Sequence, residues 1–157
     1  EELIADSAKI RTAIVHGDYS PKNMLVKDGQ VFLIDFEVVH WGDPAFDAGF
    51  LLNHLFLKGF FQPQFAVLHV RAAQAFWQSV LSQAGAATIK NFERMTMRHL
   101  GALMLARIDG KSPVEYIQKE PVKQSVRNLA RRILIERPET LEQILRVGSQ
   151  YLPQAFF

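Results

Sequence analysis

The sequence predicts an α+β fold that is mainly helical, with one short β-hairpin near the N-terminus. Three observations carry this prediction. Short β-rich runs lie within residues 12–34, the residues after Phe46 show helical spacing of apolar side chains, and the chain has no cysteine that could hold a disulfide framework. With 157 residues, 48% of them hydrophobic, the chain can bury one core. We therefore expect residues 1–157 to form a single domain and exclude a disordered or collagen-like chain.

The N-terminal elements alternate short apolar runs with polar loops. Residues 1–10 have the apolar pattern of the end of an amphipathic helix. The predicted strands are Thr12–Val15, Asn23–Val26 and Val31–Ile34. Asp28-Gly29 separates the second strand from the third, and this pair is typical of a hairpin turn because both turn positions favour positive φ. A second irregular loop is expected from residue 35 to about Phe46.

The remainder of the chain is predicted to be helical. A buried helix is expected over Asp47–Lys58, and another from Pro63 to Gly85. A third should begin with Thr88 or Asn91 as its N-cap and end at Asp109-Gly110 in a left-handed stop. The run Ser112–Glu115 matches a capping box and predicts a further helix start. The last two predicted helices are Pro121–Glu136 and Pro138–Leu152.

The charge of the chain is small and unevenly spread. The formal charge is +2, and the isoelectric point is near 9.0. Residues 1–89 carry 6 basic and 9 acidic side chains, whereas Lys90 to Arg137 carry 11 and 5. A modest basic excess on helices is usually solvated surface, so we expect no nucleic-acid partner.

No segment has the character of a membrane span or a secretory signal. The most apolar stretch, Ala45 to Phe61, is interrupted by Asp47, Asn53, His54 and Lys58, and a span needs about 20 apolar residues. No basic flank precedes an apolar run at the N-terminus. We expect a cytoplasmic protein without a membrane partner. The first residue is Glu1 rather than Met, which suggests a cut chain.

Polar residues with a shared chemistry follow the first strand and the third. His16-Gly17-Asp18 and Asn23 occupy the first loop, and Asp35 follows the third strand. Phosphoryl transfer needs a base for the acceptor hydroxyl and oxygen ligands for Mg²⁺. Because Mg²⁺ prefers a few hard oxygen ligands, one Asn amide and one Asp carboxylate suffice from the protein.

These residues stand in an order that resembles a known family. The runs His16–Asn23, Ile34–Glu37 and Gly42–Asp47 are similar to the signature of the aminoglycoside phosphotransferase and choline kinase-like family, which has a protein-kinase-like fold. The resemblance implies Mg²⁺-dependent transfer of the ATP or GTP γ-phosphate to the hydroxyl of a small molecule. It further implies that Asp18 is the catalytic base, that Asn23 and Asp35 ligate Mg²⁺, that His16 holds the catalytic loop and that Asp47 braces this loop.

A kinase of this kind also needs a nucleotide lobe. Such a lobe has a phosphate-covering loop and a Lys paired with a helix Glu, and only about 11 residues precede the first predicted strand. No Gly-Lys-Ser/Thr phosphate loop is present either. We therefore expect the chain to be the C-terminal lobe of a longer kinase, inactive or nearly so by itself, with the N-terminal lobe missing in cis.

Several residues keep two interpretations. Asp18 or Asp35 taken alone would be read as a turn residue. Glu37 could touch metal or substrate, or be a solvated carboxylate, and Asp43 is favoured as a turn or cap residue. The cluster Arg107–Pro113 could bind an anionic group of the substrate, although a helix junction with basic residues at a C-terminal dipole is favoured. His54, His69 and His99 lack metal-ligand spacing and are interpreted as structural.

Two other functional classes are alternatives to a kinase, and the charge of the chain bears on the acceptor. A non-catalytic kinase-like binding module has no physical need for Asp18, Asn23 and Asp35 together. A metal-dependent phosphohydrolase would want more clustered ligands than the early loops offer. The net charge of +6 from Lys90 to Arg137 disfavours a polycationic aminoglycoside as the acceptor and favours a neutral or anionic one, such as a sugar or a phosphorylated metabolite.

Overall fold

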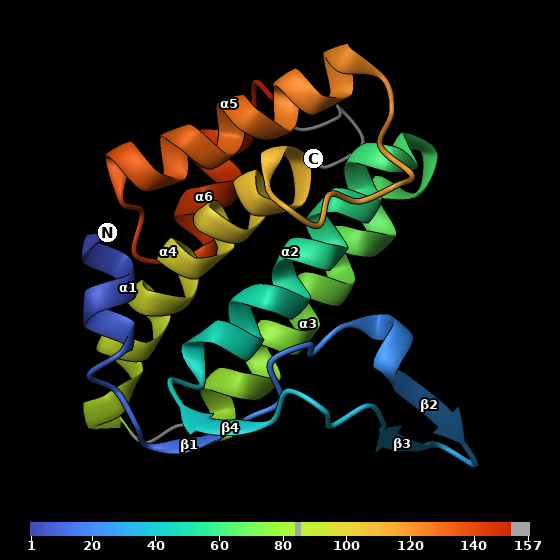
Figure 1. Ribbon diagram of the computed structural model, residues 1–157. Helices are drawn as coiled ribbons and strands as arrows, with labels where there is room; N and C mark the ends of the chain where they lie inside the picture. Colours follow the sequence, from blue (N-terminus) through green and yellow to red (C-terminus); the bar gives the residue numbers. More distant parts are fainter. Residues whose placement is uncertain (84–85, 152–157) are drawn as a thin grey trace.

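The computed structural model describes residues 1–83 and 86–151. Its architecture is mainly helical with two small two-stranded sheets, as Figure 1 shows. The α-helices are α1 (Glu2–Ser7), α2 (Ala45–Phe61), α3 (Ala66–Gln83), α4 (Ala86–Asp109), α5 (Glu120–Glu136) and α6 (Leu141–Gly148). The strands are β1 (Ala13–Val15), β2 (Met24–Lys27), β3 (Gln30–Leu33) and β4 (His40–Gly42), and short 3₁₀ helices are η1 (Pro21–Asn23) and η2 (Pro63–Phe65).

The predicted hairpin is present and its turn has the expected backbone. Strands β2 and β3 pair antiparallel from Met24 opposite Leu33 to Lys27 opposite Gln30. Asp28 and Gly29 have φ values of 51° and 75°, so both turn residues are left-handed. This conformation matches the twist of the two strands, and it makes the hairpin project from the helical body in Figure 1.

The first strand pairs with a strand that the sequence did not predict. β4 lies inside the segment expected to be irregular, and it pairs antiparallel with β1, with Ile14 opposite Trp41. The backbone hydrogen bonds between the two strands extend one residue beyond β1, because the amide of Thr12 donates to the carbonyl of Gly42. The physical reason for the wrong prediction is that three residues carry no readable alternation, and the pairing is set by a partner far along the chain.

The core lies between the long helices. α2 packs against both α3 and α4, and α4 packs against α5 on its other side. The large side chains that are fully covered include Phe56, Leu57, Met97, Met104 and Ile133. Gly49 permits the close approach of α2 to α4, since a Cβ at this position would lie 2.8 Å from the Cβ of His99. The helical body therefore forms a rigid base for the loops that cross its edge.

Asp43 is a turn residue, one of the two roles that the sequence favoured, because its carbonyl accepts from the amide of Phe46, whereas Pro44 is the N-cap of α2. Asp43 Oδ1 accepts a hydrogen bond from the amide of Ala45 at the start of α2. Its Oδ2 accepts from Ser7 Oγ at 3.1 Å and lies 3.4 Å from His99 Nε2. Burial opposes ionisation, but these hydrogen bonds lower the pKa of Asp43 overall. The carboxylate thereby ties α1, α2 and α4 together.

The predicted start of α4 is wrong, and so is the backbone conformation predicted at its end. α4 begins at Ala86, so Thr88 and Asn91 lie inside the helix and neither is its N-cap. The helix ends at Asp109 as expected, but Gly110 is not among the residues with positive φ. A side chain at Gly110 would instead collide with the carbonyl oxygen of Ala106, so close contact rather than handedness requires glycine there.

The capping-box prediction at Ser112–Glu115 is also wrong, because residues 110–119 form no helix. Val114 donates its amide to the carbonyl of Arg107, and both Val114 and Ile117 are buried. Burial of these apolar side chains outweighs the local helix signal. α6 starts at Leu141 rather than at Pro138, because Thr140 Oγ1 accepts from the amide of Gln143 and caps the helix. Leu152, its predicted end, lies outside the described residues.

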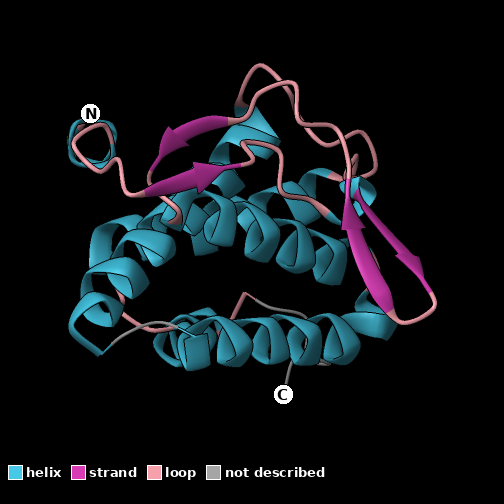
Figure 2. Ribbon diagram, turned by 90° about the horizontal axis from the view of Figure 1, so that it is seen from below, coloured by secondary structure: helices cyan, strands magenta, loops and turns pink. Residues whose placement is uncertain are grey.

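Several apolar side chains on or next to the strands are exposed. Figure 2 shows the β1–β4 pair and the β2–β3 hairpin as two separate strand pairs at the edge of the helices. The exposed apolar side chains include Ile14, Phe32, Phe36 and Trp41, with exposed fractions of 69%, 47%, 51% and 56%. Within the described residues, none of the helices has the length and hydropathy needed to cross a membrane.

Candidate active site

The loop from His16 to Asn23 is held in place by the start of α2. The carboxylate of Asp47 accepts hydrogen bonds from the backbone amides of His16 at 2.6 Å and Gly17 at 3.0 Å. Gly17 has a φ of 82°, and a Cβ here would lie 2.9 Å from Val38 Cγ2. Only glycine fits this backbone and this space without strain. Asp47 therefore fixes the point where the chain leaves β1.

His16 links this loop to the end of β3. Its Nδ1 accepts from the amide of Asp18 at 3.3 Å, and its Nε2 lies 3.0 Å from the carbonyl oxygen of Ile34. The two contacts together require a neutral ring with the proton on Nε2, because an amide can only donate and a carbonyl can only accept. The ring also packs against Phe36, with centroids 5.0 Å apart. His16 thus fixes Asp18 and both neighbours of Asp35.

Asp18 carries an ionised carboxylate near the surface. Lys22 Nζ lies 2.8 Å from Asp18 Oδ2, and Asn23 Nδ2 donates to the same oxygen at 3.0 Å. Partial burial raises the pKa of Asp18, but the hydrogen bonds from Lys22 and Asn23 outweigh it, so the pKa lies below its usual value of 3.8. The carboxylate is therefore a proton acceptor throughout the neutral range.

Asn23 is buried, with 4% of its surface exposed, at the end of η1. Its Nδ2 donates to the backbone carbonyl and to the carboxylate of Asp18. Because both partners are acceptors, the amide can be oriented in only one way. Its Oδ1 makes no hydrogen bond to any described residue. The backbone carbonyl of Asn23 accepts from the amide of Ile34, which places Asn23 beside the residue before Asp35.

Asp35 has an unusual backbone and an exposed side chain. Its φ is 68°, a left-handed conformation that is rare for residues other than glycine. Such conformations persist where neighbouring contacts fix them and concentrate at functional sites. Here His16 contacts both Ile34 and Phe36, the residues on either side. We call the side chains of Asp18, Asn23 and Asp35 the polar rim.

The two residues with open roles lie apart from each other. Glu37 follows the polar rim by two residues and is exposed. Arg107 lies in the last turn of α4, and its charge lowers the pKa of both His54 and Tyr116. The structure therefore places Arg107 beside α2 and the loop after α4.

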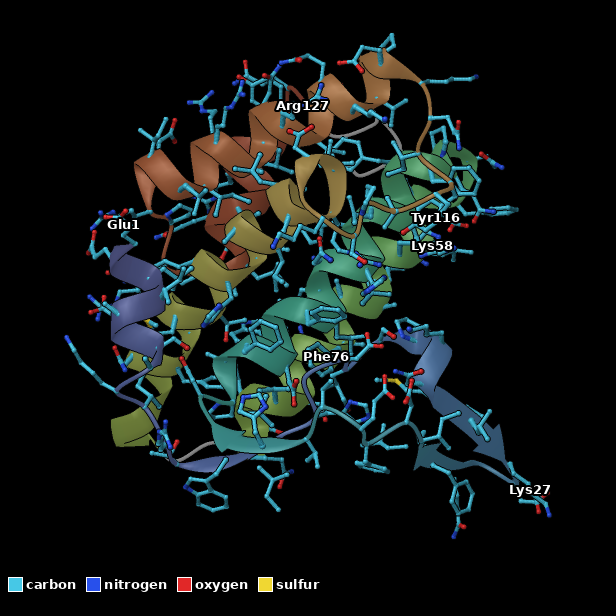
Figure 3. All side chains as sticks on the ribbon, in the orientation of Figure 1. Glu1, Lys27, Lys58, Phe76, Tyr116 and Arg127 are labelled. Carbon is cyan, nitrogen blue, oxygen red and sulfur yellow. The ribbon has the colours of Figure 1, made fainter. Side chains whose placement is uncertain are left out.

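Three residues near this site received no functional role from the sequence, in which His54 was interpreted as structural. His54 on α2 is close enough to Asp18 for each charge to shift the pKa of the other. Lys58 follows four residues later, on the same side of the helix, and its Nζ lies 4.2 Å from the ring centroid of Tyr116. Figure 3 shows Lys58 and Tyr116 side by side where α2 ends. The spacing of His54 and Lys58 was the available signal.

A cavity and the distribution of possible metal ligands also bear on the site. A cavity of about 490 Å³ lies between α1, β4 and α4, with Asp43 and His99 in its wall, and it includes none of the polar rim. Within residues 1–83 and 86–151, three or more His, Asp or Glu side chains nowhere gather as a metal cluster. The polar rim instead offers one amide oxygen and one carboxylate, hard oxygen ligands that suit Mg²⁺.

Comparison with protein families assigns the chain. The family model described as the phosphotransferase enzyme family, APH, matches residues 2–85. The chain belongs to this phosphotransferase family. The match includes the His16 loop, the hairpin, Asp35 and Asp47, so the family model spans the whole polar rim. A comparison with curated proteins found no match to this phosphotransferase.

Proposed function

We propose that this member of the phosphotransferase family transfers the γ-phosphate of ATP or GTP to a hydroxyl group of a small molecule, with Mg²⁺ as cofactor. The polar rim carries this proposal, because it combines a base and two oxygen ligands at adjoining loop ends. Nucleoside triphosphates are cytoplasmic substrates, so we place the reaction in the cytoplasm.

Asp18 is the base in the proposed reaction. The oxygen of the acceptor hydroxyl attacks the γ-phosphorus, and the new O–P bond forms as the bond to the β–γ bridging oxygen breaks. The nucleoside diphosphate leaves with the electron pair of that bond, and the hydroxyl proton passes to the Asp18 carboxylate. The lowered pKa of Asp18 keeps this carboxylate ionised before the reaction.

Asn23 and Asp35 are the proposed Mg²⁺ ligands. Asn23 uses its amide nitrogen on Asp18, which leaves Oδ1 for a cation. Asp35 is exposed, and the residue before it, Ile34, donates its amide to the backbone carbonyl of Asn23. When bound, Mg²⁺ neutralises charge on the β- and γ-phosphates. His16 and Asp47 act as positioning residues, because their contacts are to backbone groups of the loop and of Ile34.

We further propose that a nucleotide-binding lobe, supplied in cis, covers the exposed apolar side chains of the strands. Ile14 and Trp41 face each other across the β1–β4 pair and are both more than half exposed. Burying such side chains stabilises a contact by about 25 cal/mol per Å². This lobe would supply the phosphate-covering loop and the Lys–Glu pair that kinase chemistry requires.

The proposed function is tested by phosphoryl transfer in the full-length protein. Radiolabelled ATP is supplied with Mg²⁺ and a panel of alcohols, and Asp18→Asn is compared with Asp28→Asn. Asp28 is the matched control, because it is exposed in the hairpin turn and Asn tolerates its left-handed backbone. We expect Asp18→Asn to lower the rate by about 10²–10⁴-fold and the control to leave it unchanged. Equal rates in the two variants would refute the role of Asp18.

A further inference from the structure

A group of donor side chains lies beside the polar rim and is not part of it. We call His54 and Lys58 on α2, Arg107 on α4 and Tyr116 in the following loop the basic corner. Lys58 Nζ lies 4.2 Å from the centre of the Tyr116 ring, and Figure 3 shows the two residues side by side. Arg107 shifts the pKa of both His54 and Tyr116, so its charge faces the same space.

The cations of the basic corner have no carboxylate partner. Elsewhere on the helices, Arg98 pairs with Glu2 and Asp6, and Arg127 pairs with Asp109 and Glu120. Lys58 and Arg107 form no ion pair with any residue that the structure describes. Both cations act on His54 and lower its pKa, and two partly buried cations that face one side chain without an anionic partner repel each other. An anion between them would remove this repulsion.

The corner also presents polar atoms without hydrogen-bond partners. His54 Nε2, Arg107 Nε and Tyr116 Oη are covered and bind no described group. His54 is 8% exposed, so its free ring nitrogen carries a full desolvation cost. Buried polar groups in native proteins are normally paired, and one explanation for an orphan is a ligand. The three unpartnered atoms come from two helices and one loop.

The protonation states suit an anionic ligand. Burial raises the pKa of Tyr116 to about 12, so its hydroxyl remains a donor at neutral pH. Burial and the charge of Arg107 lower the pKa of His54 to about 4, so its ring is neutral. Lys58 and Arg107 supply the positive charge, and Arg can bind a phosphate or carboxylate with two parallel hydrogen bonds.

The position of His54 connects the corner to the chemistry. His54 and Asp18 each shift the pKa of the other, and Arg107 and Lys58 also act on His54, so His54 is near both the proposed base and the cations. We propose that the basic corner binds the anionic group, a phosphate or a carboxylate, of the acceptor alcohol whose hydroxyl is presented to Asp18. This inference rests on the proposed function. It narrows the acceptor that the sequence favoured, which was neutral or anionic, to an anionic one.

The binding part is tested without catalysis. Inorganic phosphate is titrated into the full-length protein saturated with MgADP, with chloride at matched ionic strength as the reference, and the imidazole resonances of His54 are followed by NMR. We expect a saturable shift of these resonances. Lys58→Gln and Arg107→Gln should each weaken phosphate binding about tenfold or more, whereas Lys27→Gln and Arg71→Gln, both exposed elsewhere, should not. Unmoved His54 resonances would overturn the proposal.

Tyr116→Phe separates a binding role from a structural one. The hydroxyl has no protein partner, so its removal should not lower the melting temperature. It should still weaken phosphate binding several-fold, since it removes one donor from the anion. An unchanged affinity in this variant, with Lys58→Gln equal to Lys27→Gln, would contradict the proposal even if Arg107→Gln fails to fold.

Acceptor preference distinguishes this inference from the proposed function. Glucose 6-phosphate, glucose and glucosamine are compared as acceptors that differ in charge. We expect transfer to favour the phosphorylated sugar, with a KM that Lys58→Gln raises about tenfold at nearly constant kcat. Asp18-dependent transfer that favours glucosamine overturns the anionic acceptor and leaves the proposed function intact. Phosphate binding at His54 without transfer to any acceptor supports the anion site and overturns the proposed function.

Discussion

The polar rim and the basic corner differ in how their polar groups are satisfied. Around the polar rim, the amides of His16 and Gly17, the ring of His16 and the Asn23 amide nitrogen all have partners within the protein. In the basic corner, His54, Arg107 and Tyr116 each keep a covered atom without one. These supports of the rim are therefore formed before any ligand arrives, although Ser20 Oγ in the same loop is also covered without a partner. In the proposed account, a ligand completes the corner.

This difference follows from the chemistry proposed for each region. A base and two metal ligands act through fixed position, so their supporting hydrogen bonds must be formed in advance. A region that recognises one charge class of acceptor must instead keep its donors free. The comparison predicts that changes in the rim's supports lower stability, and that changes in the corner alter pH dependence and binding.

The largest effect expected outside catalysis is the pH dependence of the free energy of unfolding that His54 causes. Its pKa falls from 6.5 in the unfolded chain to about 4 in the fold. Between these values the unfolded state binds more protons, so the free energy of unfolding decreases as pH falls from 6.5 to 4, by about 3 kcal/mol. Burial is the first cause, and Arg107, Lys22 and Lys58 oppose protonation while Asp18 favours it.

The measurement for His54 is denaturant unfolding of the wild type and His54→Gln across this pH range. We expect the free energy of unfolding of the variant to change clearly less with pH than that of the wild type. His69→Gln is the control, because His69 also has a lowered pKa from burial but lies on α3. A slope unchanged by His54→Gln, or reduced equally by both variants, would show that the corner holds no buried neutral histidine.

A smaller loss of stability is expected from the brace of the rim. Asp47→Ala removes the carboxylate that accepts from the amides of His16 and Gly17. Hydrogen bonds to a charged group contribute about 1.5–3 kcal/mol each, and the pair is not additive, so we expect a loss of about 2 kcal/mol. Thermal unfolding measures it, with exposed Asp28→Asn as the control, because Asn tolerates the left-handed backbone at this position. A loss of stability no larger than that of the control would contradict the claim that the supports of the polar rim contribute to stability.

The smallest expected effect on stability separates the unpartnered atoms of Asn53 from those of the basic corner. Asn53 is fully buried, and neither amide atom has a hydrogen-bond partner. Because protein covers it completely, a ligand cannot satisfy it, so Asn53→Leu should raise the free energy of unfolding by about 1 kcal/mol. Phosphate binding should stay unchanged in this variant. A loss of phosphate binding would place Asn53 with the basic corner instead.

Local chemistry made the hairpin and the polar rim predictable. Asp28-Gly29 specifies its turn through backbone preferences, and Asp18, Asn23 and Asp35 stand at a spacing that a family shares. Strand β4 and the loop at Val114 were not predictable in this way. β4 depends on pairing with β1, and Val114 is held by the carbonyl of Arg107 and by burial.

The basic corner could not be found from the sequence for a similar reason. His54 and Lys58 share a side of α2, but Arg107 and Tyr116 join them only through the packing of α2 against α4. A histidine on an apolar helix is usually a core residue, and nothing local to His54 indicates Asp18 as its neighbour. Positions that depend on tertiary packing carry no periodic signal.

The most direct test of the polar rim is to locate its metal. Crystals of the full-length protein with Mn²⁺ and a non-hydrolysable ATP analogue would be measured at an anomalous wavelength, with Asn23→Leu as the matched variant. We predict an anomalous peak that marks a Mn²⁺ ion bound by Asn23 Oδ1 and the Asp35 carboxylate. This peak should be lost in the variant. A peak held by other residues, with Asn23 and Asp35 free of metal, would contradict the assignment of the polar rim as a phosphotransferase centre.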